Sequence, residues 1–258
     1  MATFLFPRVV YGPVQSRRFG ISLGVNLLPS KNKYCNFDCI YCECGWTGNI
    51  DRTTPMPAFS DVSKALEAKL LEMKQEGKAL DVITFAGNGE PTLNPEFPVI
   101  LDETIRLCNI YFPDTKITVL TNATTLKNQN IFTALKRTDN CILKLDAGSD
   151  RLFQLINRPV EPISIDEVIS GIQQFYNNVT IQTLFLRGEL DGVMIDNTTD
   201  EEVSLWLSHI QKIKPRKVMI YPIDRETPAR NVEKLDISEL ETIGKQVAAL
   251  NVEVQIVG

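Results

Sequence analysis

The chain has 258 residues, of which 43% are hydrophobic and 23% charged, a balance typical of a globular protein with a large core. This composition excludes disordered, collagen-like and fibrous proteins. The formal net charge of −5 argues against a protein that binds nucleic acid over most of its surface. The single histidine, His209, excludes histidine zinc sites and the triads or pairs that need an imidazole base.

Targeting signals are missing from the sequence. No apolar run approaches the roughly 18 residues of a membrane span. The N-terminus has neither a basic leader nor a small-residue cleavage site. We therefore expect a cytoplasmic protein without a membrane partner.

Short β-branched runs alternate with amphipathic segments along the chain. The runs predict seven strands, over residues 21–27, 81–85, 116–121, 141–146, 179–186, 217–221 and 252–257. Apolar residues at helical spacing predict helices over 60–76, 201–213 and 238–250. The pairs Thr198–Glu201 and Ser238–Glu241 match the capping-box spacing at the last two helices.

This alternation predicts an α/β fold with crossover connections and a mainly parallel sheet. The first 60 residues supply only one predicted strand and a long loop, so a partial (β/α)6-type TIM barrel fits better than a closed barrel. The last strand alternates apolar and polar residues, which predicts an edge strand. No linker divides the chain, and we expect one domain over residues 1–258. Ligands of such sheets bind in the loops after the strands.

A cysteine triplet lies in the loop after the first predicted strand. Cys35, Cys39 and Cys42 have the spacing C-x3-C-x2-C, and thiolates at these offsets can hold three irons of one [4Fe–4S] cluster while the fourth iron stays open. Only one residue separates Cys42 from Cys44, which is short for a fourth ligand. We expect Cys44 to be a plain thiol, with a hydrogen-atom donor or a ligand at the cluster rim as alternatives. Structural zinc at the triplet is the competing interpretation.

The triplet, with aromatic Tyr41 before its last cysteine, resembles the cluster motif of the radical S-adenosylmethionine (SAM) superfamily. In that superfamily the amino and carboxylate groups of the cofactor bind the open iron. The resemblance therefore implies two cofactors, a [4Fe–4S] cluster and SAM, with Cys35, Cys39 and Cys42 as the catalytic metal ligands.

The loop FAGNGEPTLNP after the second strand strengthens the resemblance. Gly87, Gly89, Glu90 and Pro91 resemble the glycine-rich GGEP motif of the superfamily, with Asn88 in place of one glycine. Glycines let the backbone approach a ligand closely, and the Glu90 carboxylate can accept a hydrogen bond from the methionine ammonium. The alternative is a plain turn with a solvated glutamate.

Further segments extend the resemblance over nearly the whole chain. They are YGPVQSRRFGISLGVNLLP before the triplet, and LKLDAGSDRLFQLINRP, IQTLFLRGELD and YPIDRETPAR after the fourth, fifth and sixth strands. Together they resemble the iron–sulfur oxidoreductase branch called wyosine-type, after a tRNA-modifying enzyme. That enzyme uses a second cluster whose cysteines precede the triplet, and no cysteine precedes Cys35 here, so we do not expect the second cluster.

The resemblance implies an enzyme that cleaves SAM reductively to methionine and a 5′-deoxyadenosyl radical, which takes a hydrogen atom from a substrate. It also implies an electron donor such as a flavodoxin or ferredoxin. Two alternatives stay open: modification of a tRNA base, and a non-catalytic iron–sulfur or zinc protein.

Polar residues near other strand ends are further candidates for cofactor binding. Thr121 and Asn122 end the third strand, where capping of the next turn is the alternative. Asp146 ends the fourth strand on the same side as Lys144, and could hold ribose or substrate or form an ion pair with that lysine. Gln182 in the fifth strand could reach the ribose or serve local packing.

Arg187 and Arg225, in later loops, could bind an anionic substrate or the cofactor carboxylate, although solvated arginines are the alternative, which we favour for Arg187. His209 lies off the apolar stripe of its helix and is predicted to face solvent. Cys108 and Cys141 are predicted to be buried.

Residues 1–34 carry basic side chains and no acidic ones. These are Arg8, Arg17, Arg18, Lys31 and Lys33. The asymmetry is compatible with a polyanionic partner such as tRNA, with a docking face for an acidic reductase, or with an arginine pair that binds cofactor or substrate.

Overall fold

The computed structural model describes residues 4–16, 18–48 and 53–258. Its main sheet has eight strands, in the order β1 (Val10–Ser16), β2 (Gly20–Val25), β3 (Val82–Phe85), β4 (Lys116–Thr121), β5 (Asn140–Lys144), β6 (Thr180–Leu184), β9 (Lys217–Tyr221) and β11 (Glu253–Ile256). All neighbouring strands pair in parallel except β1 and β2. All seven predicted strands are present, and the α/β fold with a mainly parallel sheet is confirmed.

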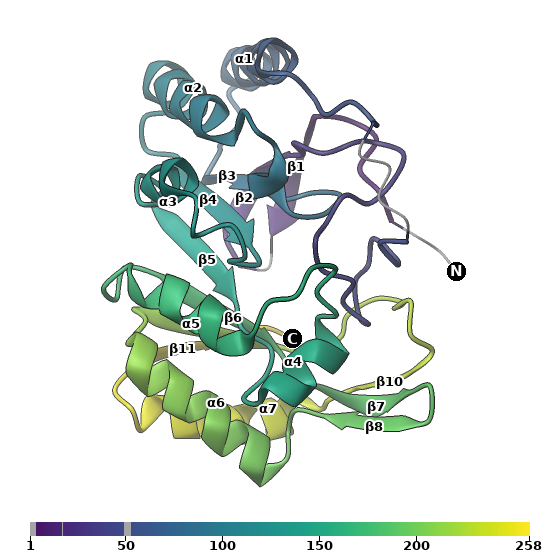
Figure 1. Ribbon diagram of the computed structural model, residues 1–258. Helices are drawn as coiled ribbons and strands as arrows, with labels where there is room; N and C mark the ends of the chain where they lie inside the picture. The colour runs from purple at the N-terminus through teal and green to yellow at the C-terminus, as the bar shows by residue number, and fades with distance from the viewer. Residues whose placement is uncertain (1–3, 17, 49–52) are drawn as a thin grey trace.

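The helices lie on the outer face of the curved sheet (Figure 1). They are α1 (Phe59–Gln75), α2 (Phe97–Tyr111), α3 (Gln129–Leu135), α4 (Asp150–Ile156), α5 (Ile165–Gln173), α6 (Asp200–Ile213) and α7 (Ile237–Ala248), with a 3-10 turn at Pro91–Leu93. The apolar stripes predicted for α1, α6 and α7 are the buried faces of those helices. None of the helices in the described segments is long and apolar enough to cross a membrane.

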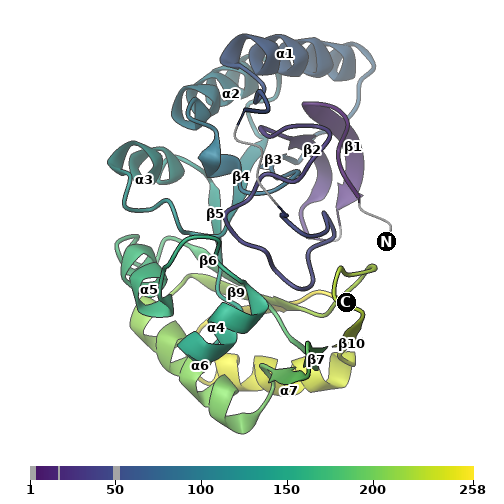
Figure 2. The same ribbon diagram turned by 45° about the vertical axis from the view of Figure 1, so that its right-hand side comes forward.

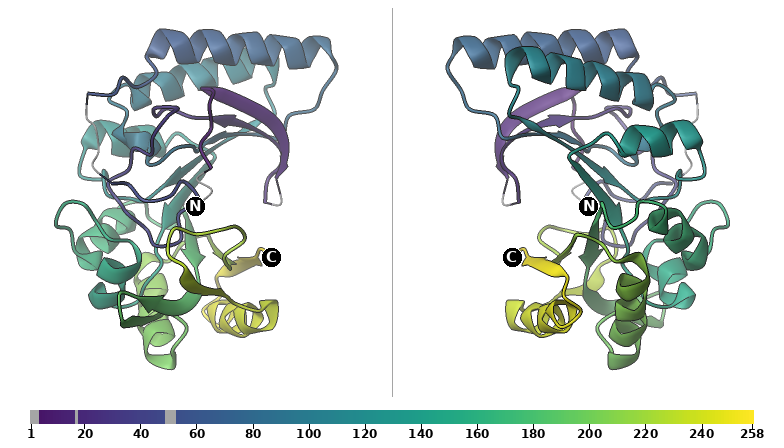
Figure 3. Two further views of the ribbon diagram at one scale, coloured as in Figure 1. Left: turned by 90° about the vertical axis from the view of Figure 1, so that its right-hand side faces the viewer. Right: turned by 90° about the vertical axis from the view of Figure 1, so that its left-hand side faces the viewer.

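The sheet forms an open arc (Figure 3). Among the described residues, β1 pairs only with β2 and β11 only with β9, so the two edges do not join. The partial barrel is therefore confirmed, as is the edge position of the last strand.

The expectation of a single strand in the first 60 residues was wrong, because β1 and β2 form an antiparallel pair. Gly12 and Pro13 interrupt the β pattern of β1, and the pairing register shifts between Tyr11 and Val14. Such an irregularity hides a strand from a search for regular alternation.

A second sheet was not predicted. It has three antiparallel strands in the order β10 (Asn231–Lys234), β7 (Leu186–Leu190) and β8 (Val193–Asp196). The predicted strand 179–186 runs across the junction of β6 and β7. The Asn197 side chain accepts from the Leu186 N–H and donates to the Leu184 carbonyl, and these contacts replace the regular ladder at the junction.

Neither predicted capping box is formed by the predicted residues: α6 has a single N-cap bond, and α7 has a capping box at other residues. Thr199, not Thr198, accepts from the backbone of Glu202 at the start of α6, because the Thr198 hydroxyl is held by Asp196 at 2.6 Å. At α7 the capping box is formed by Asp236 and Glu239, so this helix begins one residue earlier than predicted.

Candidate functional site

The cysteine loop between β2 and α1 crosses the inner side of the arc (Figure 2). Backbone pairing fixes it at several points. Tyr34 forms a parallel bridge with Gly89 in the loop after β3, and Phe37 forms an antiparallel bridge with Pro159 beyond α4. The Ile40 N–H donates to the Ile156 carbonyl at 3.0 Å. The loop is thus attached to two separate parts of the barrel, just before Cys35 and again between Cys35 and Cys42.

The three cysteines of the triplet line one cavity of about 210 Å³. Most of the predicted site residues line the same cavity, namely Tyr41, Gly87, Gly89, Glu90, Thr121, Asn122 and Gln182. Pro91 is buried in the 3-10 turn directly after Glu90. The structure therefore gathers around the triplet the loop after β3, the end of β4 and the strand β6.

The three sulfur atoms differ in their surroundings. Burial raises the pKa of Cys35, and it raises the pKa of Cys39 to about 11. The pKa of Cys42 is lowered, because its sulfur accepts a hydrogen bond from the Cys44 thiol and lies in the field of Lys33. Without a cation, the two buried sulfurs are therefore held as thiols, and metal binding would displace their protons.

Hydrogen-bond donors point at the sulfur atoms. The Phe37 N–H lies 3.4 Å from the Cys35 sulfur, and the Asn157 amide lies 3.5 Å from the Cys39 sulfur. The Asn122 amide is a third donor, 3.8 Å from the Cys35 sulfur. Donors of this kind stabilise thiolates that bind iron–sulfur clusters. This sulfur and amide set fits an anionic cluster.

Lys33 has its ammonium inside the cysteine loop. The residue is only 5% exposed, its Nζ donates to the Gly45 carbonyl at 3.0 Å, and it lies 3.8 Å from the Asp38 carboxylate. It lines the cavity of the triplet. The neighbouring cysteine sulfurs favour its charged form and raise its pKa against the opposing effect of burial. Sequence reasoning had placed Lys33 in a basic surface, and only its position two residues before Cys35 could have indicated this role.

Glu90 is neither solvated nor part of a plain turn. It is 2% exposed, and burial raises the pKa of its carboxyl. Its Oε1 accepts from the hydroxyls of Thr92 and Thr121 and from the Thr92 N–H, whereas its Oε2 accepts from the Asn122 N–H at 2.7 Å. Oε1 thus accepts three hydrogen bonds and Oε2 only one among the described residues, so Oε2 is the oxygen that can accept a further donor.

The two glycines of the GNGEP loop leave room for other parts of the chain. A Cβ on Gly89, whose φ is +140°, would lie 1.9 Å from the Tyr34 carbonyl oxygen. A Cβ on Gly87 would lie 2.2 Å from the Asn26 side-chain oxygen. Asn88 is fully buried, and its amide binds the backbone of Phe6 and Pro29. The missing side chains of Gly89 and Gly87 therefore allow the Tyr34 backbone and the Asn26 side chain to pack closely against this loop.

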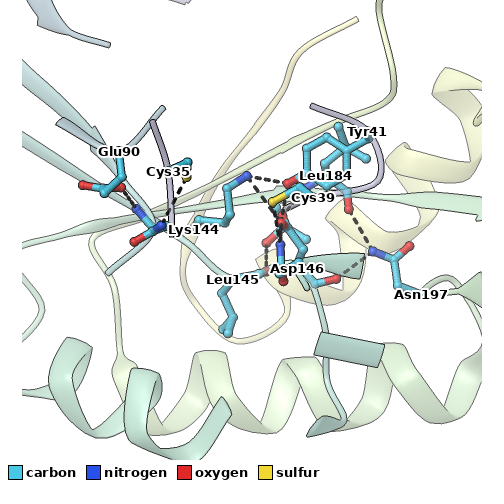
Figure 4. Close-up of polar contacts among 12 residues, drawn as sticks. Cys35, Cys39, Tyr41, Glu90, Lys144, Leu145, Asp146, Leu184 and Asn197 are labelled. Atoms are coloured by element: carbon cyan, nitrogen blue, oxygen red, sulfur yellow. Dashed lines mark hydrogen bonds and ion pairs between the residues drawn. The ribbon is translucent and has the colours of Figure 1, made fainter. Parts of the chain in front are cut away.

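Asp146 does not line the cavity and lies at the centre of a polar network (Figure 4). It has no exposed surface, accepts hydrogen bonds from Tyr41, Asn157 and the Leu184 N–H, and lies 3.4 Å from the Lys144 Nζ. The Lys144 ammonium also donates to the Tyr41 hydroxyl. Of the two alternatives for Asp146, the structure shows the ion pair.

Asn122 and Gln182 differ in how their amides are used. The Asn122 side chain donates to the Asn36 oxygen at 2.7 Å and accepts from Thr124, which is the turn capping weighed as an alternative. The Gln182 amide has no hydrogen-bond partner among the described residues although it lines the cavity. The Gln182 amide can therefore form hydrogen bonds with a ligand in this cavity.

The structure places other candidates away from the triplet. Arg187 belongs to β7, not to a loop, and pairs with Glu239. His209 is buried, not solvent-facing: its Nε2 lies 2.7 Å from the Gly148 carbonyl, because Gly148 has no side chain and α6 packs closely against it. Cys108 and Cys141 are buried, as predicted.

The described basic residues of the first segment differ in their exposure. Lys33 is buried, Arg18 is partly buried, Arg8 and Lys31 are exposed, and Arg17 lies outside the described residues. In the described part of the chain, no group of three or more His, Cys, Asp or Glu side chains converges as the ligands of a single metal ion would. The cysteines of a [4Fe–4S] cluster each bind a different iron and need no such convergence.

Comparison with known proteins gives the family. A sequence profile of the radical SAM superfamily matches residues 30–200. The chain is 31% identical over 238 residues to a UPF0026 protein of Helicobacter pylori, covering 91% of this chain and 72% of that protein. It is 30% identical over 244 residues to a Brachyspira hyodysenteriae protein described as GTPase Obg, with 93% of this chain and 33% of that protein covered. The chain thus spans a third of the Brachyspira protein.

Solved structures share the fold at low identity. A radical SAM methyltransferase from Sphaerobacter thermophilus aligns with a TM-score of 0.68 at 17% identity, over 92% of this chain and 65% of that one. An archaeal TYW1 aligns with a TM-score of 0.50 at 11% identity, over 88% of this chain and 71% of that one. The chain belongs to the radical SAM superfamily and, within it, to the UPF0026 proteins. The superfamily uses a [4Fe–4S] cluster and SAM, the two cofactors predicted.

Proposed function

We propose that this chain is a radical SAM oxidoreductase in which Cys35, Cys39 and Cys42 hold the cluster. The bound cluster and SAM would supply a one-electron reductive cleavage that yields methionine and a 5′-deoxyadenosyl radical able to take a hydrogen atom from a substrate. The observation that carries the proposal is the common cavity of the triplet and the GNGEP loop, with amide donors directed at two of the sulfurs.

The residues around the triplet have separable roles in this proposal. Glu90 accepts one hydrogen bond from the cofactor ammonium through Oε2, while Thr121 and Asn122 hold its carboxylate in position. Gln182 offers its free amide to the ribose. Tyr41 forms a cavity wall, and its hydroxyl is fixed between Lys144 and Asp146.

An external one-electron donor, of the flavodoxin or ferredoxin type, completes the proposal. All six cysteines are free, as a reducing compartment such as the cytosol would keep them. The net charge of −5 and the burial of Lys33 favour a substrate other than RNA.

The test is spectroscopic. The chain is reconstituted anaerobically with iron and sulfide, reduced, and examined by electron paramagnetic resonance with and without SAM. We expect about four irons per chain and a spectrum that changes on addition of SAM, because three cysteine ligands leave one iron open. One zinc per chain without iron, or a cluster spectrum indifferent to SAM, would refute the proposal.

A further inference from the structure

A second cavity of about 270 Å³ adjoins the cavity of the triplet. Five residues form walls of both: Tyr41, Cys42, Cys44, Leu120 and Gln182. The remaining walls include Tyr221 at the end of β9, Val257 beyond β11, and Arg18 between β1 and β2. The second cavity therefore lies on the open side of the barrel, where Figure 3 shows the two edges of the sheet facing each other.

Arg18 joins the two sides of this opening. Its guanidinium carbon lies 5.8 Å from the centre of the Tyr221 ring and 5.7 Å from that of Phe19. Cation–π attraction to two rings holds the guanidinium at this place, and its N–H groups can still donate to a ligand.

The charge of Arg18 is not neutralised by the described residues. It forms no ion pair with any carboxylate among them, whereas Arg225, the other arginine of this cavity, pairs with Glu43 at 2.7 Å. Asp224, the second carboxylate of the wall, has an interaction of its own. Two arginines and two carboxylates line the cavity, and Arg18 has no carboxylate partner among the described residues.

The rest of the wall limits the ligand. Leu120, Leu184, Ile223 and Val257 supply apolar surface to the second cavity. The volume lies just below the roughly 300–1,000 Å³ of pockets that enclose drug-sized molecules. A compact molecule with an apolar body and one anionic group matches these walls, and a base-paired RNA segment does not.

We infer that this second cavity is the substrate subsite and that Arg18 binds an oxyanion, a carboxylate or phosphate, of a small-molecule substrate. The inference rests on the proposed function, because it places the substrate beside the site of radical formation. Arg18 forms two N–H···O hydrogen bonds to the oxyanion, and the apolar body of the substrate extends toward the shared wall of Tyr41 and Gln182.

Chemical labelling of the anaerobically reconstituted full chain tests the inference. Phenylglyoxal modifies open arginines, and peptide mass spectrometry gives the rate at each one. Inorganic phosphate and malonate serve as probes, and exposed Arg8 is the internal control. We expect saturating phosphate or malonate to slow labelling of Arg18 at least fivefold and that of Arg8 less than twofold. The probe effective at the lower concentration identifies the phosphate or the carboxylate as the preferred group.

Several results would overturn the inference. Resistance of Arg18 to labelling in the free protein would do so, as would equal rates of Arg18 labelling with and without either probe. Protection by SAM alone would assign Arg18 to the cofactor, and protection by bulk tRNA alone would assign the cavity to RNA. As an independent check, calorimetry should detect binding of the effective probe to the Arg8→Gln variant and none to Arg18→Gln; equal binding to both would also overturn the inference.

Cleavage of SAM is measured in the same preparation to separate the two claims. A preparation that protects Arg18 but does not cleave SAM would refute the proposed function and leave the anion subsite. A preparation that cleaves SAM but shows no protection of Arg18 would refute the subsite alone.

Discussion

The carbonyl oxygen of Tyr34 occupies the space that a side chain on Gly89 would need. The two residues pair as a parallel bridge, in which the Tyr34 N–H donates to the Asn88 carbonyl and the Glu90 N–H donates to the Tyr34 carbonyl. This contact joins the cysteine loop to the GNGEP loop directly before Cys35. The position of the first cysteine therefore depends on a glycine 54 positions along the chain (89 − 35).

Gly89→Ala should destabilise the protein and displace the cysteine loop. The φ of +140° disfavours any side chain, and the Cβ would collide with backbone at 1.9 Å, so we expect a loss of about 3 kcal/mol in the free energy of unfolding. Gly77→Ala is the matched control, since its φ is +65° but nothing lies within 4 Å of the new Cβ; it should cost about 1 kcal/mol. Urea unfolding and iron content measure both effects. Equal losses in the two variants would show that the bridge is unimportant.

Each cysteine of the triplet should be necessary for the cluster. Alanine at Cys35, Cys39 or Cys42 removes one of three ligands, and we expect iron and sulfide after reconstitution to fall from about four per chain toward zero. Cys44→Ala should retain iron, although its loss removes the hydrogen bond that lowers the pKa of Cys42. Iron and sulfide analysis decides the matter; loss of the cluster in Cys44→Ala would make that residue a ligand.

Lys33→Met should lower the reduction potential of the cluster. Reduction adds a negative charge, which a nearby buried ammonium stabilises, so its removal should shift the potential down by on the order of 50 mV. Lys31→Met, in the same segment but exposed, is the control and should shift it by less than about 10 mV because solvent screens its charge. A redox titration followed by electron paramagnetic resonance gives both potentials. An unchanged potential in Lys33→Met would show that Lys33 does not act on the cluster and only donates a hydrogen bond to the Gly45 carbonyl.

Glu90→Gln should keep the cluster and weaken SAM binding by about 1.5–3 kcal/mol, the range for a hydrogen bond to a charged group. Glu96→Gln is the control, because Glu96 also accepts a backbone N–H, that of Phe59, but does not line the triplet cavity. Equilibrium binding of SAM to the reconstituted proteins gives the difference. The same SAM affinity in Glu90→Gln and wild type would show that Glu90 does not bind SAM and only accepts hydrogen bonds from Thr121 and Asn122.

The fold followed from local pattern, and the missed elements had no such pattern. Strands such as β4 and β9 are short apolar runs, and the prediction matched their bounds. In contrast, β1 is interrupted by Gly12 and Pro13, and the junction of β6 and β7 depends on the side chain of Asn197. The residues around the junction of β6 and β7 do not indicate the contacts that the distant Asn197 makes there.

In the candidate site, too, the sequence pattern predicted some features and missed others. Spacing was enough to select the triplet, and the structure gathers it with Glu90, Thr121 and Gln182. The surroundings of single side chains were not predictable. Lys33 was placed in a basic surface but is buried in the loop, and His209 was placed in solvent but contacts Gly148. In both cases a partner distant along the chain or a backbone carbonyl determines the position.

Formation of 5′-deoxyadenosine is the most direct test of the central claim. Wild-type chain with a reconstituted cluster, a strong one-electron reductant and SAM should produce 5′-deoxyadenosine and methionine in equal amounts, measured by mass spectrometry. Cys39→Ala, carried through the same reconstitution, should produce neither above the level of reductant and SAM alone. A wild-type protein that holds four irons and is reduced, yet forms no more 5′-deoxyadenosine than Cys39→Ala, would contradict the account.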